Sequence, residues 1–388
     1  MVNLRLNVFY WRPMRRFVAY ILLTFATLVG GGYALSAQES QPELKLQADF
    51  TTLFDNKEYA EMRGVDSGTL FGARLTPMVG IEWQERNSLM VGADLYQDFG
   101  YNKFLSKAKL QLYYAYKVLQ VKLYAGIFPR SAMRGLNSPL FFDPSYCYYN
   151  NSISGVLARY EEEPYMSYVE FAMDYTGMRT FNTREAFSIM SSAKYFFCGY
   201  YDADIFSCGY DFYMGHYAKD YNPDTIDGVV DNLMLAPYIA FEHNSLCMLG
   251  SRYPLALDVR LSYVQSLQRD RIGENVWKHP FGGELYVALW WAGIELSNRL
   301  YVGKGSLLTY YNRYGAEVYH NMPIYRTEKG IYDAIALSYS QRFFDDTVGL
   351  KAGVTVEYNG TGWGTRQWLQ VDVNLGTDIS LKRSKDIE

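Results

Sequence analysis

Residues 107–128 read KAKLQLYYAYKVLQVKLYAGIF, and the pattern of this stretch decides the fold class. Apolar side chains occupy every second position, and lysines occupy positions of the opposite parity. These lysines are Lys107, Lys109, Lys117 and Lys122. A period of two is typical of a β-strand with two unlike faces. Because Leu119 and Gln120 alone interrupt the pattern, the stretch predicts two strands joined by a very short turn.

The N-terminus has the pattern of a secretory signal peptide. Residues 1–16 contain four arginines and no acidic residue, and the apolar run FVAYILLTFATLVGGGYALSA follows them. A basic start, an apolar core and a small-residue cleavage site define such peptides. We therefore predict that residues 1–37 are a cleaved signal peptide and that 38–388 form the mature domain. A membrane anchor is the alternative for this run.

Composition narrows the class of protein. The whole chain has 37 basic and 41 acidic residues, and residues 1–37 contribute four arginines and no acid, so the mature chain has a net charge of −8. This balance argues against a nucleic-acid partner. After the signal there is no run of about 18 apolar residues, so no transmembrane helix is predicted. The 37 tyrosines suit a boundary between hydrocarbon and water.

About sixteen alternating segments follow one another along the chain. Their approximate spans are 44–54, 69–84, 88–98, 106–118, 120–129, 152–161, 165–175, 185–198, 203–214, 231–242, 254–267, 282–291, 293–303, 331–343, 346–358 and 366–376. Short connections follow most even-numbered segments, and longer ones follow most odd-numbered segments. Membrane barrels alternate short periplasmic turns with longer extracellular loops in this way. We predict an all-β fold with a single transmembrane antiparallel β-barrel of about 16 strands, or 14 if two segments are loops.

Charged side chains recur on one parity of these segments. A lysine on the lipid face near the bilayer midplane costs about 2–4 kcal/mol, so the charged parity is predicted to face the lumen. The predicted pore-lining residues are Lys107, Lys109, Lys117, Lys122, Glu170, Asp174, Asp258, Arg260, Glu295, Arg299, Lys351, Glu357 and Asp372. Both signs of charge occur among them, so no strong ion selectivity is implied.

The sequence contains little that indicates catalysis. Its histidines, His216, His243, His279 and His320, have no metal-ligand spacing, and no GxSxG or Walker-type loop occurs. His216 with Asp220, or His320 with Glu317, could form an acid–base pair, but solvated loop histidines explain the pattern more simply. We predict no catalytic residue, no metal, no cofactor and no enzyme activity.

Two cysteines and two connections leave alternatives open. Cys198 and Cys208 flank a predicted turn and either form a disulfide or remain free thiols. Residues 130–151 are aromatic and apolar for an exposed loop. They fit a constriction inside the lumen, a surface for a partner, or a loop packed against the barrel wall. Residues 304–330 are rich in tyrosine, which fits either a binding rim or a membrane interface.

Several stretches carry a resemblance. They are GIFPRSAMRG at 126–135, FAMDYTGM and NTREAF within 171–187, GVVDNLMLAPY at 228–238, GGELYVALWWAGIELSNRLYVGKG at 282–305 and YHNMPIYR at 319–326. In these stretches the chain resembles a family of uncharacterised outer-membrane β-barrels from Bacteroidetes-type bacteria. The resemblance implies the fold and an outer-membrane location, and it assigns no catalytic residue.

Three function classes remain at this point: a pore, a structural barrel and a barrel enzyme. Sixteen strands leave room for a channel. We therefore predict a pore for small polar solutes in the outer membrane of a Gram-negative bacterium, reached by signal-peptide export. The alternative is a closed barrel that acts as a subunit or scaffold of an envelope assembly or secretion complex. The predicted partners are outer-membrane lipid and either small polar solutes or an envelope protein.

Overall fold

The computed structural model describes residues 42–142, 144–162, 167–180, 185–199, 204–217, 230–246, 255–271, 275–305, 327 and 329–380. The predicted signal peptide and most of the tyrosine-rich segment 304–330 lie outside these residues. Within the described ranges, no helix is both long enough and apolar enough to cross a membrane.

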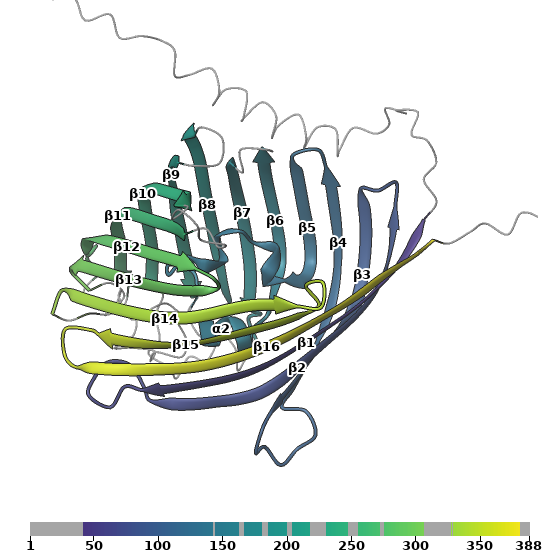
Figure 1. The fold of residues 1–388 in the computed structure, drawn as a ribbon, viewed down its shortest axis with the longest axis horizontal. Coiled ribbons are helices and arrows are strands. Elements are labelled where there is room, and N and C mark those ends of the chain that lie inside the picture. The colour runs from purple at the N-terminus through teal and green to yellow at the C-terminus, as the bar shows by residue number, and fades with distance from the viewer. Residues whose placement is uncertain are drawn as a thin grey trace, which may run out of the picture. The chain divides into compact units, whose positions relative to one another are not determined.

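Sixteen antiparallel strands form one closed barrel (Figure 1). They are β1 (Glu43–Glu58), β2 (Gly68–Trp83), β3 (Asn87–Asp98), β4 (Lys107–Val118), β5 (Val121–Pro129), β6 (Ser152–Glu162), β7 (Ser167–Gly177), β8 (Ala186–Gly199), β9 (Asp204–Tyr217), β10 (Val230–Leu246), β11 (Leu255–Asp270), β12 (Phe281–Trp291), β13 (Ile294–Gly303), β14 (Ile331–Phe343), β15 (Val348–Tyr358) and β16 (Trp363–Ser380). Each strand pairs with its neighbours in sequence, and β1 pairs with β16 to close the sheet. The predicted fold class is confirmed, with 16 strands rather than 14.

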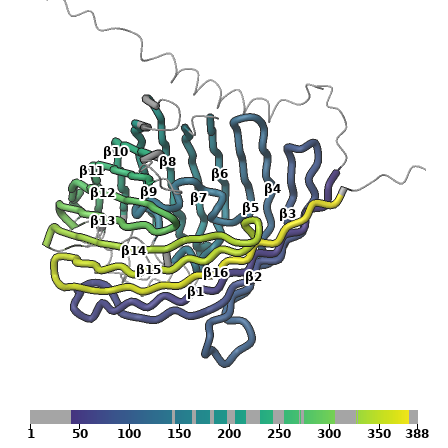
Figure 2. The backbone as a smooth tube through the Cα atoms, in the orientation of Figure 1, coloured from purple at the N-terminus to yellow at the C-terminus, as the bar shows by residue number. Residues whose placement is uncertain are grey.

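The two ends of the barrel differ in their connections (Figure 2). At one end, which we call the turn end, hairpins such as β12–β13 are tight. There Ala292 and Gly293 have φ of 51° and 84°, as a two-residue hairpin turn requires. At the other end, the loop end, most connections are longer, and residues 359–362 between β15 and β16 are a short exception.

Alternation along each strand separates the two faces of the wall. In β4, Leu110 and Leu112 are 54% and 44% exposed on the outer face, whereas Gln111 and Ala115 are 0% and 1% exposed in the lumen. The lysines of β4 share the lumen parity. The apolar outer face and charged lumen therefore follow the period-two pattern of the sequence.

Leu112→Lys tests this arrangement, because it places a charge on the outer face. We expect the variant to fold into lipid vesicles less favourably by about 2–4 kcal/mol, measured by urea titration and heat-modifiable gel mobility. Lys117→Glu, which changes a charge on the lumen parity, is the matched control and should fold like the wild type. Equal folding of both variants would show that the two faces are assigned wrongly.

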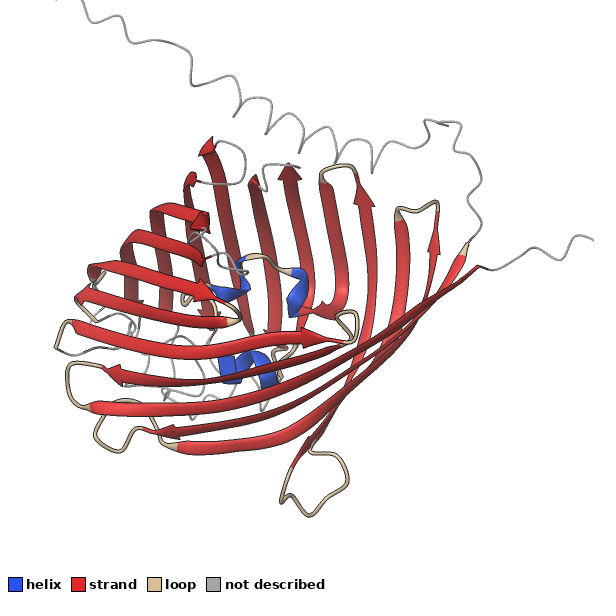
Figure 3. Cartoon of the chain, viewed as in Figure 1, coloured by secondary structure: helices blue, strands red, loops and turns tan. Residues whose placement is uncertain are grey.

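Residues 130–151, which we call the inner segment, fold into the lumen in the part that the structure describes, which leaves out residue 143 (Figure 3). The segment contains two short 3₁₀ turns, η2 (Arg130–Ala132) and η3 (Gly135–Asn137), and one helix, α2 (Pro144–Tyr149). Leu140 and Phe141 are 0% and 1% exposed, and they share a buried cluster with lumen-facing side chains of nine strands, β5 to β11, β13 and β14. The segment therefore lies inside the barrel and packs against its wall.

Candidate functional site

Two carboxylates of β7 hold the inner segment. Glu170 accepts hydrogen bonds from the backbone nitrogens of Arg134 at 3.0 Å and Gly135 at 2.6 Å. Asp174 forms an ion pair with Arg130 at 2.6 Å, and the two side chains are 3% and 2% exposed. The strand therefore satisfies polar groups of the segment that would otherwise be buried without partners.

Arg130 lies at the centre of this contact. Its guanidinium lies over the rings of Phe142 and Tyr146, at 4.2 Å and 5.1 Å from their centroids. Burial raises the pKa of Tyr146, so its hydroxyl stays neutral beside the ion pair with Asp174. A buried charge that loses its partner is strongly destabilising, so Arg130 and Asp174 depend on each other.

All the predicted pore-lining residues have lumen-facing parity, but the inner segment covers several of them. Glu170 and Asp174 bind the segment directly, and Lys107 and Lys109 donate to Asn150 at 3.1 Å and 3.3 Å. These four side chains of the barrel wall therefore contact the inner segment inside the lumen.

Six of the others contact further side chains of the barrel in the lumen. Lys122 pairs with Glu161 at 3.0 Å, Arg299 with Glu284 at 2.8 Å, and Arg260 with Asp211. Glu357 accepts from Tyr59 at 2.7 Å and Tyr332 at 3.0 Å, Glu295 from Tyr286 at 3.2 Å, and Asp372 from Thr51 at 2.9 Å. Lys117, Asp258 and Lys351 also have lumen parity. Their role in lining a pore remains a prediction.

A polar cluster that the sequence did not reveal lies on the outer face, near the loop end of β1, β2 and β16. It consists of Asn56, Glu58, Thr69 and Gln367, which we call the rim cluster. Asn56 is the cross-strand partner of both Thr69 and Gln367. Its side-chain amide donates to Glu58 at 3.1 Å and to Gln367 at 2.9 Å, and its oxygen accepts from Thr69 at 2.6 Å.

The rim cluster combines groups that acyl chemistry needs. Glu58 is an exposed carboxylate that can accept a proton. Asn56 donates both of its amide N–H groups within the cluster, whereas Gln367 donates one to Thr365 at 3.0 Å and can donate the other to an oxygen that becomes negative during reaction. The signal in the sequence was polar residues on the otherwise apolar parity, at the margins of the first and last segments.

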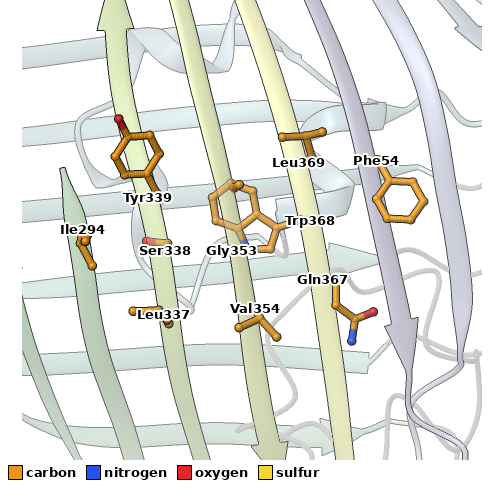
Figure 4. A pocket seen from close by; sticks show the side chains of 11 residues that line it. Phe54, Ile294, Leu337, Ser338, Tyr339, Gly353, Val354, Gln367, Trp368 and Leu369 are labelled. Atoms are coloured by element: carbon orange, nitrogen blue, oxygen red, sulfur yellow. The ribbon is translucent and has the colours of Figure 1, made fainter.

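An apolar groove of about 710 Å³ adjoins this cluster (Figure 4). Mainly outward-facing side chains line it, in two cross-strand rows. Leu337, Val354 and Gln367 form one row, and Tyr339, Ala352 and Leu369 form the other. Ala352 lies between Tyr339 and Leu369, and its small side chain leaves the groove open at this point.

Gln367 belongs to both features, because it lines the groove and accepts a hydrogen bond from Asn56 of the rim cluster. The second row continues to Phe54 near the loop end of β1 and to Ile294, the first residue of β13 after its tight turn. Cross-strand rows run obliquely in a tilted barrel. The groove therefore extends from the rim cluster toward the turn end.

Two of the described histidines have an aspartate as cross-strand partner on the outer face: His216 with Asp231, and His243 with Asp204. His216 stacks on Phe187 on the outer face, with ring centroids 4.7 Å apart, and His243 lies beside Phe241. Asp220, Glu317 and His320 lie outside the described residues. In the ranges the structure describes, no three His, Cys, Asp or Glu side chains are grouped as metal ligands. Cys208 is a free cysteine.

Known structures are similar to this chain over most of its length. OccD3 (OpdP) of Pseudomonas aeruginosa matches with a TM-score of 0.50 and 11% identity, covering 88% of this chain and 93% of that chain. OmpT, an outer membrane protein of Vibrio cholerae, has a TM-score of 0.48 and 9% identity, covering 87% and 100%. OccAB3 of Acinetobacter baumannii has a TM-score of 0.43 and 10% identity, covering 86% and 99%. Such low identities concern the fold and do not transfer a function.

No curated protein sequence matches the chain significantly. A family model described as "Lipid A 3'-O-deacylase-type" matches residues 36–359, which is most of the chain. This match agrees with the predicted resemblance to an outer-membrane family, whereas the Bacteroidetes-type origin remains a prediction. The prediction that the chain is not an enzyme is wrong, because the matching family is an enzyme family. By this match, the chain belongs to the lipid A 3′-O-deacylase-type family.

Proposed function

We propose that this barrel is an outer-membrane enzyme that hydrolyses an acyl ester of lipid A. The observation that carries the proposal is the junction at Gln367, where a polar cluster on the outer face meets an apolar groove. Such a junction suits a lipid whose ester links a polar head to an acyl chain. The description of the family supplies the substrate class.

The orientation in this proposal follows the general plan of outer-membrane barrels. Such barrels place short turns in the periplasm and longer loops outside the cell. Export through the predicted signal peptide would bring the chain to the periplasm for insertion. The loop end then faces the cell exterior, so the rim cluster lies at the level of lipid A headgroups in the outer leaflet.

The proposed chemistry is attack of water on the ester carbonyl. The carboxylate of Glu58 takes a proton from the water as its oxygen bonds to the carbonyl carbon. The amide N–H of Gln367 that is not bonded to Thr365 stabilises the negative charge on the carbonyl oxygen. The carbon–oxygen bond of the ester then breaks, and the proton passes from Glu58 to the sugar oxygen, leaving a free fatty acid and a hydroxyl group.

Ala352→Phe tests the groove, because it raises the floor where the acyl chain would lie. We expect the deacylation activity of this variant to be at least tenfold lower than that of the wild type, measured by mass spectrometry of lipid A from cells expressing the protein. Ala158→Phe, at an exposed outer-face position of β6, is the matched control and should remain active. Activity in cells producing folded Ala352→Phe equal to that of the control would exclude the groove as the acyl site.

The predicted pore is the second candidate. It is favoured by the many charged side chains with lumen parity, and it is weakened by the inner segment, which shares a buried cluster with nine strands of the wall. The alternative of a closed barrel in an envelope assembly fits a filled lumen. Single-channel conductance in a planar bilayer separates a pore from both other functions.

A further inference from the structure

The outer face carries an unusual pair of arginines at the loop end of β11. Every other lysine or arginine in the described strands has lumen parity, whereas Arg269 points to the outer face. Arg271 follows directly after β11, two residues further on. A basic residue toward lipid is costly near the midplane but much less so near the interface, where a polar partner is at hand.

One carboxylate of β10 holds both guanidinium groups. Asp231 accepts from Arg269 at 2.8 Å and 2.6 Å, and from Arg271 at 2.9 Å and 2.7 Å. The two side chains of Arg269 and Arg271 are 25% and 50% exposed. The group of Asp231, Arg269 and Arg271 therefore carries two positive charges and one negative charge, and both arginines are partly exposed on the outer face.

Trp277 completes the surface. The guanidinium of Arg269 lies 4.5 Å from the centroid of its ring. Two backbone hydrogen bonds between Gln268 and Lys278, of 2.9 Å and 2.7 Å, fix this part of the chain against β11. Further along the same outer face, Tyr263 and Leu261 are 48% and 54% exposed. The arginines thus lie at the boundary between an apolar wall and the loop end.

From this arrangement we infer that Arg269 and Arg271 bind a phosphate group of an outer-leaflet lipid headgroup. A guanidinium presents several N–H donors in a plane, and this geometry suits phosphate. Asp231 uses Nε and Nη2 of each arginine, and Nη1 of neither has a hydrogen-bond partner within the described ranges. The excess positive charge and the free donors face the level that anionic headgroups occupy.

This site is separate from the rim cluster. Five strand-to-strand steps separate β11 from β16. At about 4.8 Å per strand this is about 24 Å along the wall, so the arginines and the rim cluster are distinct parts of the outer face. The inference uses the orientation given under the proposed function but not the hydrolytic activity.

Binding can be measured on the full barrel carrying Glu58→Gln, which removes the proposed base and so separates binding from turnover. Native mass spectrometry or titration in detergent would compare lipid A that has its phosphates, lipid A from which they have been removed, and inorganic phosphate. We expect Arg269→Gln with Arg271→Gln to weaken binding of phosphorylated lipid A at least tenfold. Arg342→Gln, an exposed arginine at the turn end, should have no effect.

Asp231→Asn separates a ligand site from a purely structural ion pair. If the arginines bind phosphate, removing the competing carboxylate should tighten binding of phosphorylated lipid A several-fold. If they serve folding alone, this variant should lose heat-modifiable mobility and gain no affinity, and the inference fails. It also fails if the double variant binds like the wild type, if dephosphorylated lipid A binds equally well, or if inorganic phosphate binds as tightly as the lipid.

Discussion

Replacing Glu58 with glutamine is expected to lower lipid A deacylation by roughly 10²–10⁴-fold, the range that a general base contributes. Glutamine has nearly the same shape and can keep the hydrogen bond from Asn56 by presenting its carbonyl oxygen. It cannot accept the proton of the attacking water. The variant therefore removes the chemical step and leaves the rim cluster and the groove in place.

The rate is measured by incubating purified barrels in vesicles containing lipid A and following released fatty acid by mass spectrometry. Glu162→Gln is the matched control, because Glu162 is also exposed on the outer parity but lies at the turn end of β6. The control should retain wild-type activity. If folded Glu58→Gln also retains it, the base is a different group and the rim cluster is not the reacting site.

The strands and the orientation of their faces could be predicted from the sequence because both follow local alternation. In residues 107–128 each lysine occupies the parity that faces the lumen, and each leucine of β4 occupies the outer parity. A closed barrel has one inner and one outer surface. Once one strand shows which of its faces is apolar, the faces of the neighbouring strands are assigned to the lumen or the outside as well. This is why the strand count and the lumen parity needed no long-range information.

The position of the inner segment could not be predicted in the same way. Leu140 and Phe141 are apolar whether the segment lies inside the lumen or on a surface. The structure places it inside because Glu170 and Asp174, on β7, accept its backbone N–H groups and the guanidinium of Arg130. Those acids looked like pore-lining charges in the sequence, where their partners were unknown.

The rim cluster was hidden for a different reason. Asn56 and Gln367 are 311 positions apart in the chain and become neighbours only when β1 pairs with β16. Each residue alone looks like the polar end of a strand. Histidine and glycine motifs that indicate catalysis have fixed spacing, and a constellation made by barrel closure has no such spacing. That explains why the prediction of no enzyme activity was wrong.

Asp174→Asn is expected to loosen the inner segment, because it leaves Arg130 buried at 2% exposure without its ion-pair partner. Breaking a buried pair from one side costs about 3–5 kcal/mol. We expect a lower urea midpoint of unfolding and, once the segment moves, a rise in single-channel conductance. Asp372→Asn is the control, since Asp372 faces the lumen but bonds to Thr51 of the wall.

A second variant distinguishes a lost ion pair from general damage to the wall. Arg130→Met with Asp174→Leu removes both charges, so neither is left buried alone, and it should recover part of the stability that Asp174→Asn loses. A wild-type barrel that does not conduct, with conductance gained in Asp174→Asn, identifies the inner segment as the closure of the lumen. If the wild-type barrel conducts as well as Asp174→Asn, solutes pass through the lumen while the inner segment stays in its place. The function as a pore would then be better supported than a closed barrel with enzyme activity.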